Sequence, residues 1–392
     1  MIGGGIIGIN MARELKKTYP GSKVTLIEKE KDCGMHASGR NSGVLHAGFY
    51  YSPESLKAKF TKSGNRALTK YCEDRGLPIN KCGKLVVAKD EGDLKSLDEL
   101  LQMGRANGIE LEEVSEREAR KIEPRVKTFA RAIYSPTTST VSPSHVMDSL
   151  KLDTVREGVK IHCGVGYVKK LKNGIQTTKD VYQAGYYVNA AGVYADKVAK
   201  DFGFSRDYCL LPFKGLYLYS DEPAHSLKTN IYPVPDLRNP FLGVHFTKTV
   251  DGRTKIGPTA IPAFWREHYR RFENFRLSEL VEVITREVML LFLARFDFRR
   301  LALEEIRKYS KEKLVSLAAS LAGGVRKENY MKWGSPGIRA QLLNLKKKTL
   351  EMDFVIEGDG SSMHILNAVS PAFTCSIPFA KHVAAEIKTR LG

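Results

Sequence analysis

Met1-Ile-Gly-Gly-Gly-Ile-Ile-Gly8 opens the chain and decides how the rest of the sequence is interpreted. Its glycines at Gly3, Gly5 and Gly8 form the Gly-x-Gly-x-x-Gly pattern of a loop that joins a strand to a helix. An apolar face at helical spacing over residues 6–17 predicts that helix directly after the loop. Such glycines let the backbone turn tightly and approach a pyrophosphate, whose charge is favoured at the helix N-terminus. The stretch therefore predicts a dinucleotide-binding loop.

The residues on either side of the loop extend this interpretation. The apolar run Lys23-Val-Thr-Leu-Ile27 predicts a strand that ends at Glu28, twenty positions after Gly8. An acid at this place binds the ribose of a dinucleotide. A strand also belongs before the glycines, but only Met1 and Ile2 precede them. We therefore expect a chain that begins late and lacks the first strand of this fold.

Length and charge restrict the class of protein. A chain of 392 residues, 42% of them hydrophobic, is long enough for two interleaved globular domains. The net charge of +18 raises nucleic acid, an anionic membrane surface and acidic substrates as partners. Because the basic residues form only small scattered groups, the sequence argues against nucleic-acid binding. No apolar run is long enough to span a membrane as a helix.

Six cysteines are spread along the chain without any Cys-x-x-Cys pair. This spacing argues against a zinc site and against a disulfide scaffold, and we expect no metal. Free cysteines are typical of a reducing compartment, either the cytosol or the mitochondrial matrix.

Patterns typical of nucleotide-binding βα units recur at the beginning, the middle and the end of the chain. Later strands are predicted over 183–188 and 353–357, and a last helix over 377–390. Between these units, alternating apolar and polar positions over 210–262 predict antiparallel strands, and residues 276–331 are predicted to be helical.

This interleaving predicts an α/β fold in which a glutathione-reductase-type FAD domain alternates with an antiparallel-sheet substrate domain and a helical insert. The expected parts of the FAD domain are residues 1–80, 144–209 and 336–392. The expected parts of the substrate domain are residues 81–143 and 210–335, the second with the helical insert.

Several motifs in a fixed order point to one protein family. The longest is Gly39-Arg-Asn-Ser-Gly-Val-Leu-His-Ala-Gly-Phe-Tyr-Tyr51. It overlaps the glycine-rich stretch 34–48, whose two histidines and one arginine are unlike an ordinary linker. The others are Tyr71-Cys72 with Cys82-Gly-Lys-Leu85, Asn189-Ala-Ala-Gly192, Pro212-Phe-Lys-Gly-Leu-Tyr217, Tyr232-Pro-Val-Pro235, Phe241-Leu-Gly-Val-His-Phe-Thr247, Gly257-Pro258, Gly337-Ile-Arg-Ala-Gln341 and His364-Ile-Leu-Asn-Ala-Val-Ser-Pro371. With these motifs the chain resembles the FAD-dependent L-2-hydroxyglutarate dehydrogenases of the D-amino-acid oxidase superfamily over nearly its whole length.

The resemblance implies a reaction, a cofactor and partners. It implies oxidation of L-2-hydroxyglutarate to 2-oxoglutarate by hydride transfer from C2 to the N5 atom of FAD, which carries out the difficult step. A small dicarboxylate is the implied substrate, and a quinone, an electron-transfer flavoprotein or oxygen remains open as electron acceptor. A peripheral membrane contact and a mitochondrial location, otherwise a cytoplasmic one, are further expectations.

Candidate catalytic residues follow from the chemistry that the resemblance implies. His46 is the first choice as the base for the 2-hydroxyl proton, since histidine titrates near neutrality, and His245 is its rival. Arg339 is similar to the superfamily arginine that holds the substrate carboxylate, a task that suits its planar fork. Arg40 or Lys214 is expected to hold the second carboxylate. His36 and His364 are expected to contact cofactor or backbone.

The remaining candidates are small or polar residues expected to bind FAD through backbone and hydroxyl groups, although glycine, serine and asparagine also dominate ordinary turns. They are Gly3, Gly5, Gly8, Glu28, Ser38, Asn41, Ser42, Gly43, Ala191, Gly192, Asn367 and Ser370.

Two other functions remain open. The first is a flavin oxidase of an amine such as glycine or sarcosine, which turnover of amino acids would reveal. The second is a relative without catalytic activity that has lost FAD, which the absence of a flavin absorption spectrum would reveal.

Overall fold

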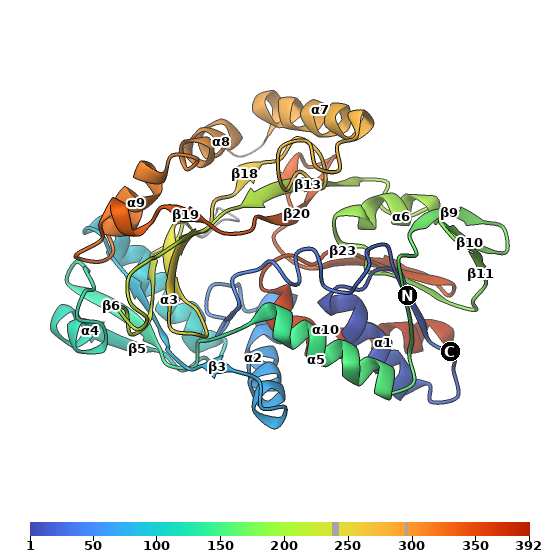
Figure 1. Cartoon of the computed structure of the whole chain (residues 1–392), viewed down its shortest axis with the longest axis horizontal. Coiled ribbons are helices and arrows are strands. Elements are labelled where there is room, and N and C mark those ends of the chain that lie inside the picture. The colour runs from blue at the N-terminus through green and yellow to red at the C-terminus, as the bar shows by residue number, and fades with distance from the viewer. Residues whose placement is uncertain (237–242, 295–296) are drawn as a thin grey trace.

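The computed structural model describes residues 1–236, 243–294 and 297–392 (Figure 1). Phe241 and Leu242, which belong to the sequence motif that ends at Thr247, lie outside the described residues.

A central sheet collects strands from distant parts of the chain. Its strands are β1 (Thr25–Glu28), β8 (Lys160–Cys163), β12 (Tyr187–Asn189), β22 (Val355–Gly358) and β23 (Ser362–Asn367). β1 pairs in parallel with β8, β12 pairs in parallel with β23, and β22 adds an antiparallel edge. Strands far apart in sequence therefore form one layer, as the interleaved pattern predicts.

Ile2 joins the two halves of this sheet, directly before the glycine loop. It forms parallel bridges with Ile27 of β1 and with Asn189 of β12. Its N–H donates to the carbonyl of Val188 at 2.9 Å, and its side chain is 4% exposed. The described residues form no full strand here, but Ile2 keeps the sheet continuous.

Helices and a small sheet cover the two faces of the central sheet (Figure 1). On one face lie α1 (Ile6–Thr18), α2 (Leu56–Asp74), α5 (Pro143–Arg156) and α10 (Ala372–Leu391), which share one apolar core with β1 and β23. On the other lie α6 (Ala195–Asp201) and a sheet of β9 (Tyr167–Leu171), β10 (Gly174–Thr177) and β11 (Val181–Tyr182). The result is a three-layer unit.

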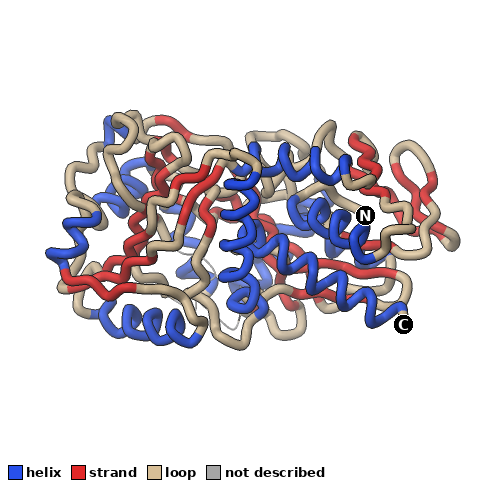
Figure 2. The backbone as a smooth tube through the Cα atoms, turned by 90° about the horizontal axis from the view of Figure 1, so that it is seen from below, coloured by secondary structure: helices blue, strands red, loops and turns tan. Residues whose placement is uncertain are grey.

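A large, mainly antiparallel sheet forms the other half of the molecule (Figure 2). In spatial order its strands are β19 (Lys332–Trp333), β14 (Leu218–Tyr219), β17 (Thr254–Gly257), β16 (His245–Lys248), β15 (Asn230–Pro233), β4 (Lys84–Val87), β6 (Arg131–Ser135) and β5 (Glu112–Ser115). α3 (Gly92–Ala106) packs on one face, and α4 (Glu116–Ile122) and α9 (Lys311–Ala319) pack on the other.

A third sheet lies between the two halves. It consists of β18 (Ile261–Pro262), β13 (Tyr208–Gly215), β20 (Gly337–Asn344) and β21 (Thr349–Leu350), with α7 (Leu277–Leu293) and α8 (Phe298–Arg307) packed along it. β13 and β20 pair from Tyr208↔Asn344 to Gly215↔Gly337, which places Phe213 opposite Arg339. The short elements are β2 (Val44–Leu45), β3 (Ile79–Asn80), β7 (Ser139–Val141), η1 (Gly192–Tyr194) and η2 (Lys327–Asn329).

Two predicted elements differ from the structure. The strand predicted over 183–188 is confined to β12, which begins at Tyr187. The last helix begins at Ala372 rather than at 377 and contains Pro378. Proline has no N–H to offer the carbonyl of Thr374, but this end of the helix is held by close packing: a Cβ on Gly64 of α2 would lie 2.2 Å from that carbonyl oxygen. Tertiary contact thus overrides the proline signal.

The predicted helical insert forms the separate helices α7, α8 and α9. A buried ion pair ties α7 to α6, because the guanidinium of Arg266, 0% exposed, donates to Asp196 at 2.6 and 2.9 Å and to Glu282 at 3.0 Å. In the part of the chain that the structure describes, no helix has the length and apolar character needed to cross a membrane.

Candidate functional site

The glycine loop at the start of the chain passes between two strands with room only for backbone. Gly3 has φ +104°, and a Cβ at this position would lie 2.4 Å from the carbonyl oxygen of Ala190. A Cβ on Gly8 would lie 2.0 Å from the carbonyl oxygen of Gly3. Both positions therefore require glycine, the first for conformation as well as for space.

Glu28 and Ser38 hold this loop in place. The carboxylate of Glu28 accepts the N–H of Gly4 at 2.7 Å and the N–H of Glu30 at 2.9 Å. The hydroxyl of Ser38 accepts the N–H of Ile6, in the first turn of α1, at 2.9 Å. Gly5, the N-cap residue of α1, has no side chain to cap the helix, and it lines the space beside the loop.

A cavity of about 480 Å³, here called the loop cavity, lies beside the glycine loop. Six predicted cofactor residues line it together with His36, and these are Gly3, Gly5, Glu28, Ser38, Ala191 and Gly192. A helix N-terminus, a tight glycine loop and an acid at one cavity are the features that hold the phosphates and ribose of a dinucleotide. The residues present therefore fit such a group.

A second cavity of about 250 Å³, here called the sheet cavity, lies between the central sheet and the large sheet. The two cavities share Ala37, Ser38, Gly192, Ile338 and Ala340 as walls. His46, His245 and Arg339, the three predicted catalytic residues, all line the sheet cavity, as do Asn41, Ser42 and Ser370. Residues from opposite ends of the chain therefore meet where the two cavities adjoin.

His46 lies one residue after β2, and its side chain is 6% exposed. Its backbone N–H donates to the hydroxyl of Thr374 at 3.2 Å, while its Nδ1 is buried without a hydrogen-bond partner among the described residues. Burial holds the pKa of His46 well below its usual value, and the nearby charges of Lys84, His245 and Arg339 lower it further. The imidazole of His46 is therefore neutral and can accept a proton.

His245 begins β16 and stacks on Tyr232, with ring centres 3.7 Å apart. Its Nδ1 lies 3.1 Å from the carbonyl oxygen of Gly243, which can only accept a hydrogen bond. In the neutral ring Nδ1 therefore carries the proton and Nε2 carries the lone pair. His245 is thus also equipped to accept a proton.

Arg339 projects from β20 opposite Phe213, and both residues line the sheet cavity. Burial lowers the pKa of Arg339, and the neighbouring Tyr51, Tyr217 and Glu305 oppose that shift. An arginine keeps its charge under such conditions. Glu305 is the only acid among the described residues that line this cavity, so the cavity is electropositive.

The structure separates the two residues proposed from the sequence as a second cation. Arg40 lines the sheet cavity, with its Nε bonded to the carbonyl oxygen of Met35 at 2.8 Å and its guanidinium 4.3 Å from the ring centre of Tyr269. Lys214 lines neither cavity among the described residues. It lies near His268, whose pKa is lowered mainly by burial and further by the charge of Lys214.

Several residues predicted to contact the cofactor line neither described cavity, and the structure shows their contacts within the protein. The Asn367 side chain donates to the carbonyls of Glu351 and Asp353, at 3.1 and 2.5 Å, and lines neither described cavity. His364 contacts Asn189 and Ser362 inside the core. The same holds for Gly8, which packs on Gly3, and for Gly43, whose N–H donates to Asn41 at 2.8 Å.

Lys84 is the residue near the site that the sequence analysis did not single out. It lies on β4, is fully buried, and its Nζ has no hydrogen-bond partner among the described residues. The sequence held a signal for this residue. Lys84 begins the run Lys84-Leu-Val-Val-Ala88, whose apolar residues are typical of a buried strand, and a lysine is rarely buried.

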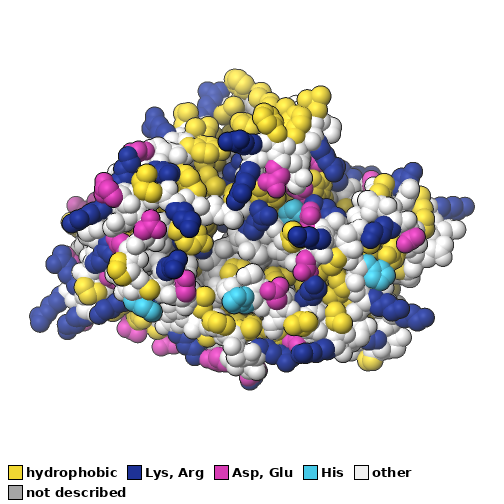
Figure 3. All heavy atoms as spheres, in the orientation of Figure 1, with side chains coloured by type: hydrophobic (Ala, Val, Ile, Leu, Met, Phe, Trp, Pro, Cys, Tyr) yellow, Lys and Arg dark blue, Asp and Glu magenta, His cyan; other side chains and the backbone are white. Residues whose placement is uncertain are grey.

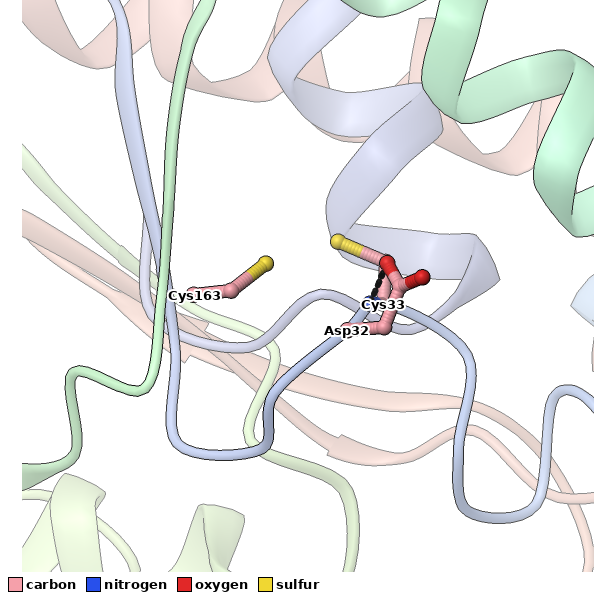
Figure 4. A group of neighbouring side chains, drawn as sticks. All are labelled: Asp32, Cys33 and Cys163. Atoms are coloured by element: carbon pink, nitrogen blue, oxygen red, sulfur yellow. Dashed lines mark hydrogen bonds between the residues drawn. The ribbon is translucent and has the colours of Figure 1, made fainter.

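Two groups of side chains have the composition of a metal site. In Figure 4 the sulfur atoms of Cys33 and Cys163 point toward each other, and Asp32 bonds to the backbone N–H of Cys33. Lys151 pairs with the Asp32 carboxylate at 2.5 Å, and burial raises the pKa of Cys33 to about 12. In the other group Lys29 already pairs with Glu30 and Glu267 beside His36. A lysine thus competes with a cation at both places.

Comparison with known proteins agrees with this geometry. A family model described as FAD dependent oxidoreductase matches residues 1–385. L-2-hydroxyglutarate dehydrogenase of Escherichia coli K12 is 34% identical, covering 100% of this chain and 93% of the relative. The mitochondrial L-2-hydroxyglutarate dehydrogenase of Mus musculus is also 34% identical, covering 99% of this chain and 88% of the relative.

Solved structures show the same fold. L-α-glycerophosphate oxidase of Mycoplasma pneumoniae with FAD bound has a TM-score of 0.77 at 22% identity, covering 99% of this chain and 93% of that one. Glycine oxidase of Geobacillus kaustophilus has a TM-score of 0.75 at 19% identity, covering 99% and 94%. The α/β fold class predicted from the sequence is therefore confirmed.

The glycine loop generates a first prediction. Gly3→Ala places a Cβ against Ala190 and forces an unfavourable φ, so we expect loss of bound flavin and a lower melting temperature, with destabilisation of more than ~1 kcal/mol. Flavin absorbance per protein and thermal unfolding measure both effects. Gly21→Ala is the matched control, because no atom lies within 4 Å of its Cβ position. Full flavin content in Gly3→Ala would contradict the role given to the loop.

Proposed function

Because the chain belongs to the FAD-dependent oxidoreductases, and among them to the L-2-hydroxyglutarate dehydrogenase family, we propose that it oxidises L-2-hydroxyglutarate to 2-oxoglutarate. The observation that carries this proposal is the meeting of His46, His245 and Arg339 on one electropositive cavity that adjoins the glycine loop. Oxidation of a 2-hydroxy acid requires a base that accepts the hydroxyl proton and a cation, such as a guanidinium, that binds the carboxylate.

The cofactor is FAD, and the chain's own residues divide the work of holding it and the substrate. The glycine loop, the N-terminus of α1 and Glu28 would hold the phosphates and ribose at the loop cavity. Asn41, Ser42 and Ser370 lie in the wall of the sheet cavity, where the flavin end belongs. When bound, FAD supplies the acceptor for the two electrons of the substrate.

The substrate's reacting end is assigned to the three predicted catalytic residues. Arg339 binds the carboxylate next to C2 through two parallel hydrogen bonds, and so fixes the orientation of the hydroxyl group. His46 takes the hydroxyl proton, since its low pKa keeps the imidazole neutral and its Nδ1 has no partner among the described residues. His245, the first residue of β16, orients the acid. Phe213 and Tyr232 add apolar walls that exclude water.

The proposed reaction is tested by anaerobic addition of substrate to the purified flavoprotein. We expect L-2-hydroxyglutarate to bleach the flavin absorbance, because C2 is oxidised without any other acceptor present. Glycine and sarcosine serve as the comparison, and bleaching by either amine in place of the hydroxy acid would favour an amine oxidase. A colourless protein that cannot be loaded with FAD would instead favour the relative without catalytic activity.

Substitution of the two histidines assigns the base. His46→Gln should keep flavin binding and slow flavin reduction by about 10²–10⁴-fold, the usual worth of a positioned general base. His245→Gln should mainly weaken substrate affinity. Anaerobic stopped-flow reduction over a range of substrate concentrations separates the rate from the affinity. If His245→Gln loses the reduction step while His46→Gln keeps it, the two roles must be exchanged.

A peripheral membrane contact is the second part of the proposal. One face of α7 exposes Leu277, Val281, Ile284, Val288 and Phe292, with exposed fractions between 40% and 71%; we call this face the α7 stripe. Figure 3 shows apolar side chains gathered at this end of the molecule with arginines and lysines around them. An exposed apolar helix face bordered by positive charge fits the interface of an anionic bilayer.

The electron acceptor remains unassigned among a quinone, an electron-transfer flavoprotein and oxygen. Contact through the α7 stripe would favour a quinone, since quinones dissolve in the bilayer. A mitochondrial location is supported by the mitochondrial relatives, although bacterial relatives are equally similar.

Vesicle binding tests the α7 stripe. We expect the flavoprotein to sediment with vesicles containing phosphatidylglycerol, less with pure phosphatidylcholine, and less at high salt. Val281→Glu with Phe292→Glu should abolish this binding without changing turnover in solution. Leu152→Glu, an equally exposed apolar residue on α5, is the control. Binding that persists in the double variant would remove the stripe as the contact.

A further inference from the structure

Lys84 lies in a box of aromatic rings behind the wall of the sheet cavity. Its Nζ is 4.5 Å from the ring centre of Phe49, 4.4 Å from that of Tyr50 and 4.9 Å from that of Tyr232. Tyr232 itself lines the cavity and stacks on His245. The charge of Lys84 acts on His46, whose pKa it lowers. The ammonium therefore lies at the end of the cavity whose wall contains His46 and Tyr232.

This box leaves several buried polar atoms unsatisfied. The Nζ of Lys84, the hydroxyl of Tyr50 and the Nδ1 of His46 are buried without hydrogen-bond partners among the described residues. Ring faces attract a cation, but they accept none of its three N–H groups fully. Leaving buried donors unmet costs free energy, so such a cluster is expected where a ligand supplies the acceptor.

Four of the other buried lysines differ from Lys84, because each has a nearby partner; Lys214 is the exception, since burial alone lowers its pKa. Lys57 lies beside Asp353, which raises its pKa against the effect of burial. Lys255 has Asp251 nearby, and Lys248 donates to the carbonyl of Lys228 at 3.4 Å. Lys308 pairs with Glu305. Burial alone accounts for the lowered pKa of Lys84, and no carboxylate among the described residues acts on it.

We propose that Lys84 binds the second carboxylate of the substrate and so selects dicarboxylic over monocarboxylic 2-hydroxy acids. This rests on the proposed oxidation of a 2-hydroxy acid, with Arg339 holding the carboxylate next to C2. The flexible four-carbon stem of lysine lets Nζ move toward the cavity when an anion arrives. Of the three cations considered for this role, only Lys84 has a buried nitrogen without a hydrogen-bond partner among the described residues, and it borders Tyr232 of the cavity wall. Arg40 lines the sheet cavity, but its guanidinium already bonds to the Met35 carbonyl and packs on Tyr269.

Proton uptake is an independent consequence. Burial lowers the pKa of Lys84 to about 7, so ammonium and neutral amine coexist near neutrality before the ligand binds. The groups that face it, His46, Tyr50 and Tyr232, carry no negative charge at that pH, so only the ligand's carboxylate can raise its pKa. Binding of glutarate, the dicarboxylate without the reacting hydroxyl, should therefore take up a proton, whereas binding of pentanoate should not.

Substitution of Lys84 tests the assignment in the holoenzyme. Lys84→Met keeps the length of the side chain and fits the aromatic box, and Lys84→Arg keeps the charge. We expect Lys84→Met to raise KM for L-2-hydroxyglutarate about ten- to hundredfold, the worth of a charge-assisted hydrogen bond, with kcat little changed. KM for L-2-hydroxypentanoate, which has a methyl group in place of the second carboxylate, should stay unchanged. Lys84→Arg should retain part of the preference.

Lys248→Met is the matched control, a buried lysine of the same sheet whose substitution should leave the ratio of the two KM values unchanged. An equal rise of both KM values in Lys84→Met, or no rise, would overturn the assignment. If Lys84→Met fails to fold, calorimetric titration of the unmodified enzyme with glutarate and pentanoate in two buffers decides through proton uptake. Failure of both acids to reduce the flavin would count against the proposed reaction and not against Lys84.

Discussion

The passage of the first residues between β1 and β12 is the constraint on which the rest of this structure depends. Gly3 passes Ala190 so closely that a Cβ would lie 2.4 Å from its carbonyl oxygen, and Gly8 touches the carbonyl of Gly3 in the same way. This contact is backbone against backbone, so the helix that follows starts within the sheet layer. The N-terminus of α1 therefore faces the loop cavity, and Ser38 and Glu28 bind the same few peptide groups from the other side.

The catalytic end depends on a different balance, in which positive charge dominates a partly apolar cavity. Arg339, His46 and His245 line it with one acid, Glu305, and Lys84 stands behind its wall. Burial of cations without enough anions lowers the pKa values of His46 and Lys84. An empty site of this kind is electrostatically unfavourable, and a dianionic ligand relieves it. The affinity for a dicarboxylate and the neutral state of the base His46 then have the same physical origin, which is the excess of buried positive charge.

Local patterns in the sequence were sufficient for much of the site. The glycine spacing, the strand that ends at Glu28 and the motif around His46 depend on neighbours in the chain, and the structure brings their residues to the two adjoining cavities. Arg339 and His245 were placed by resemblance, and both line the sheet cavity. Asn367 and Gly43 stay predictions as cofactor residues, because a turn residue that binds backbone and one that binds a ligand have the same local pattern.

By itself the sequence determined the α/β class and the dinucleotide loop, because these depend on spacing and periodicity over short stretches. The family followed from the resemblance of its ordered motifs. The sequence also determined which histidines and arginines were available to the chemistry. Only the tertiary structure decided that Ile2 bridges the two halves of the central sheet and that α10 begins at Ala372, ahead of Pro378. It likewise decided that Lys214 lies outside both cavities while Lys84 lies in a ring of aromatic side chains beside His46. The physical reason is that burial and the electrostatic neighbours of a charge are set by residues distant in the chain, such as Phe49 and Tyr232 around Lys84.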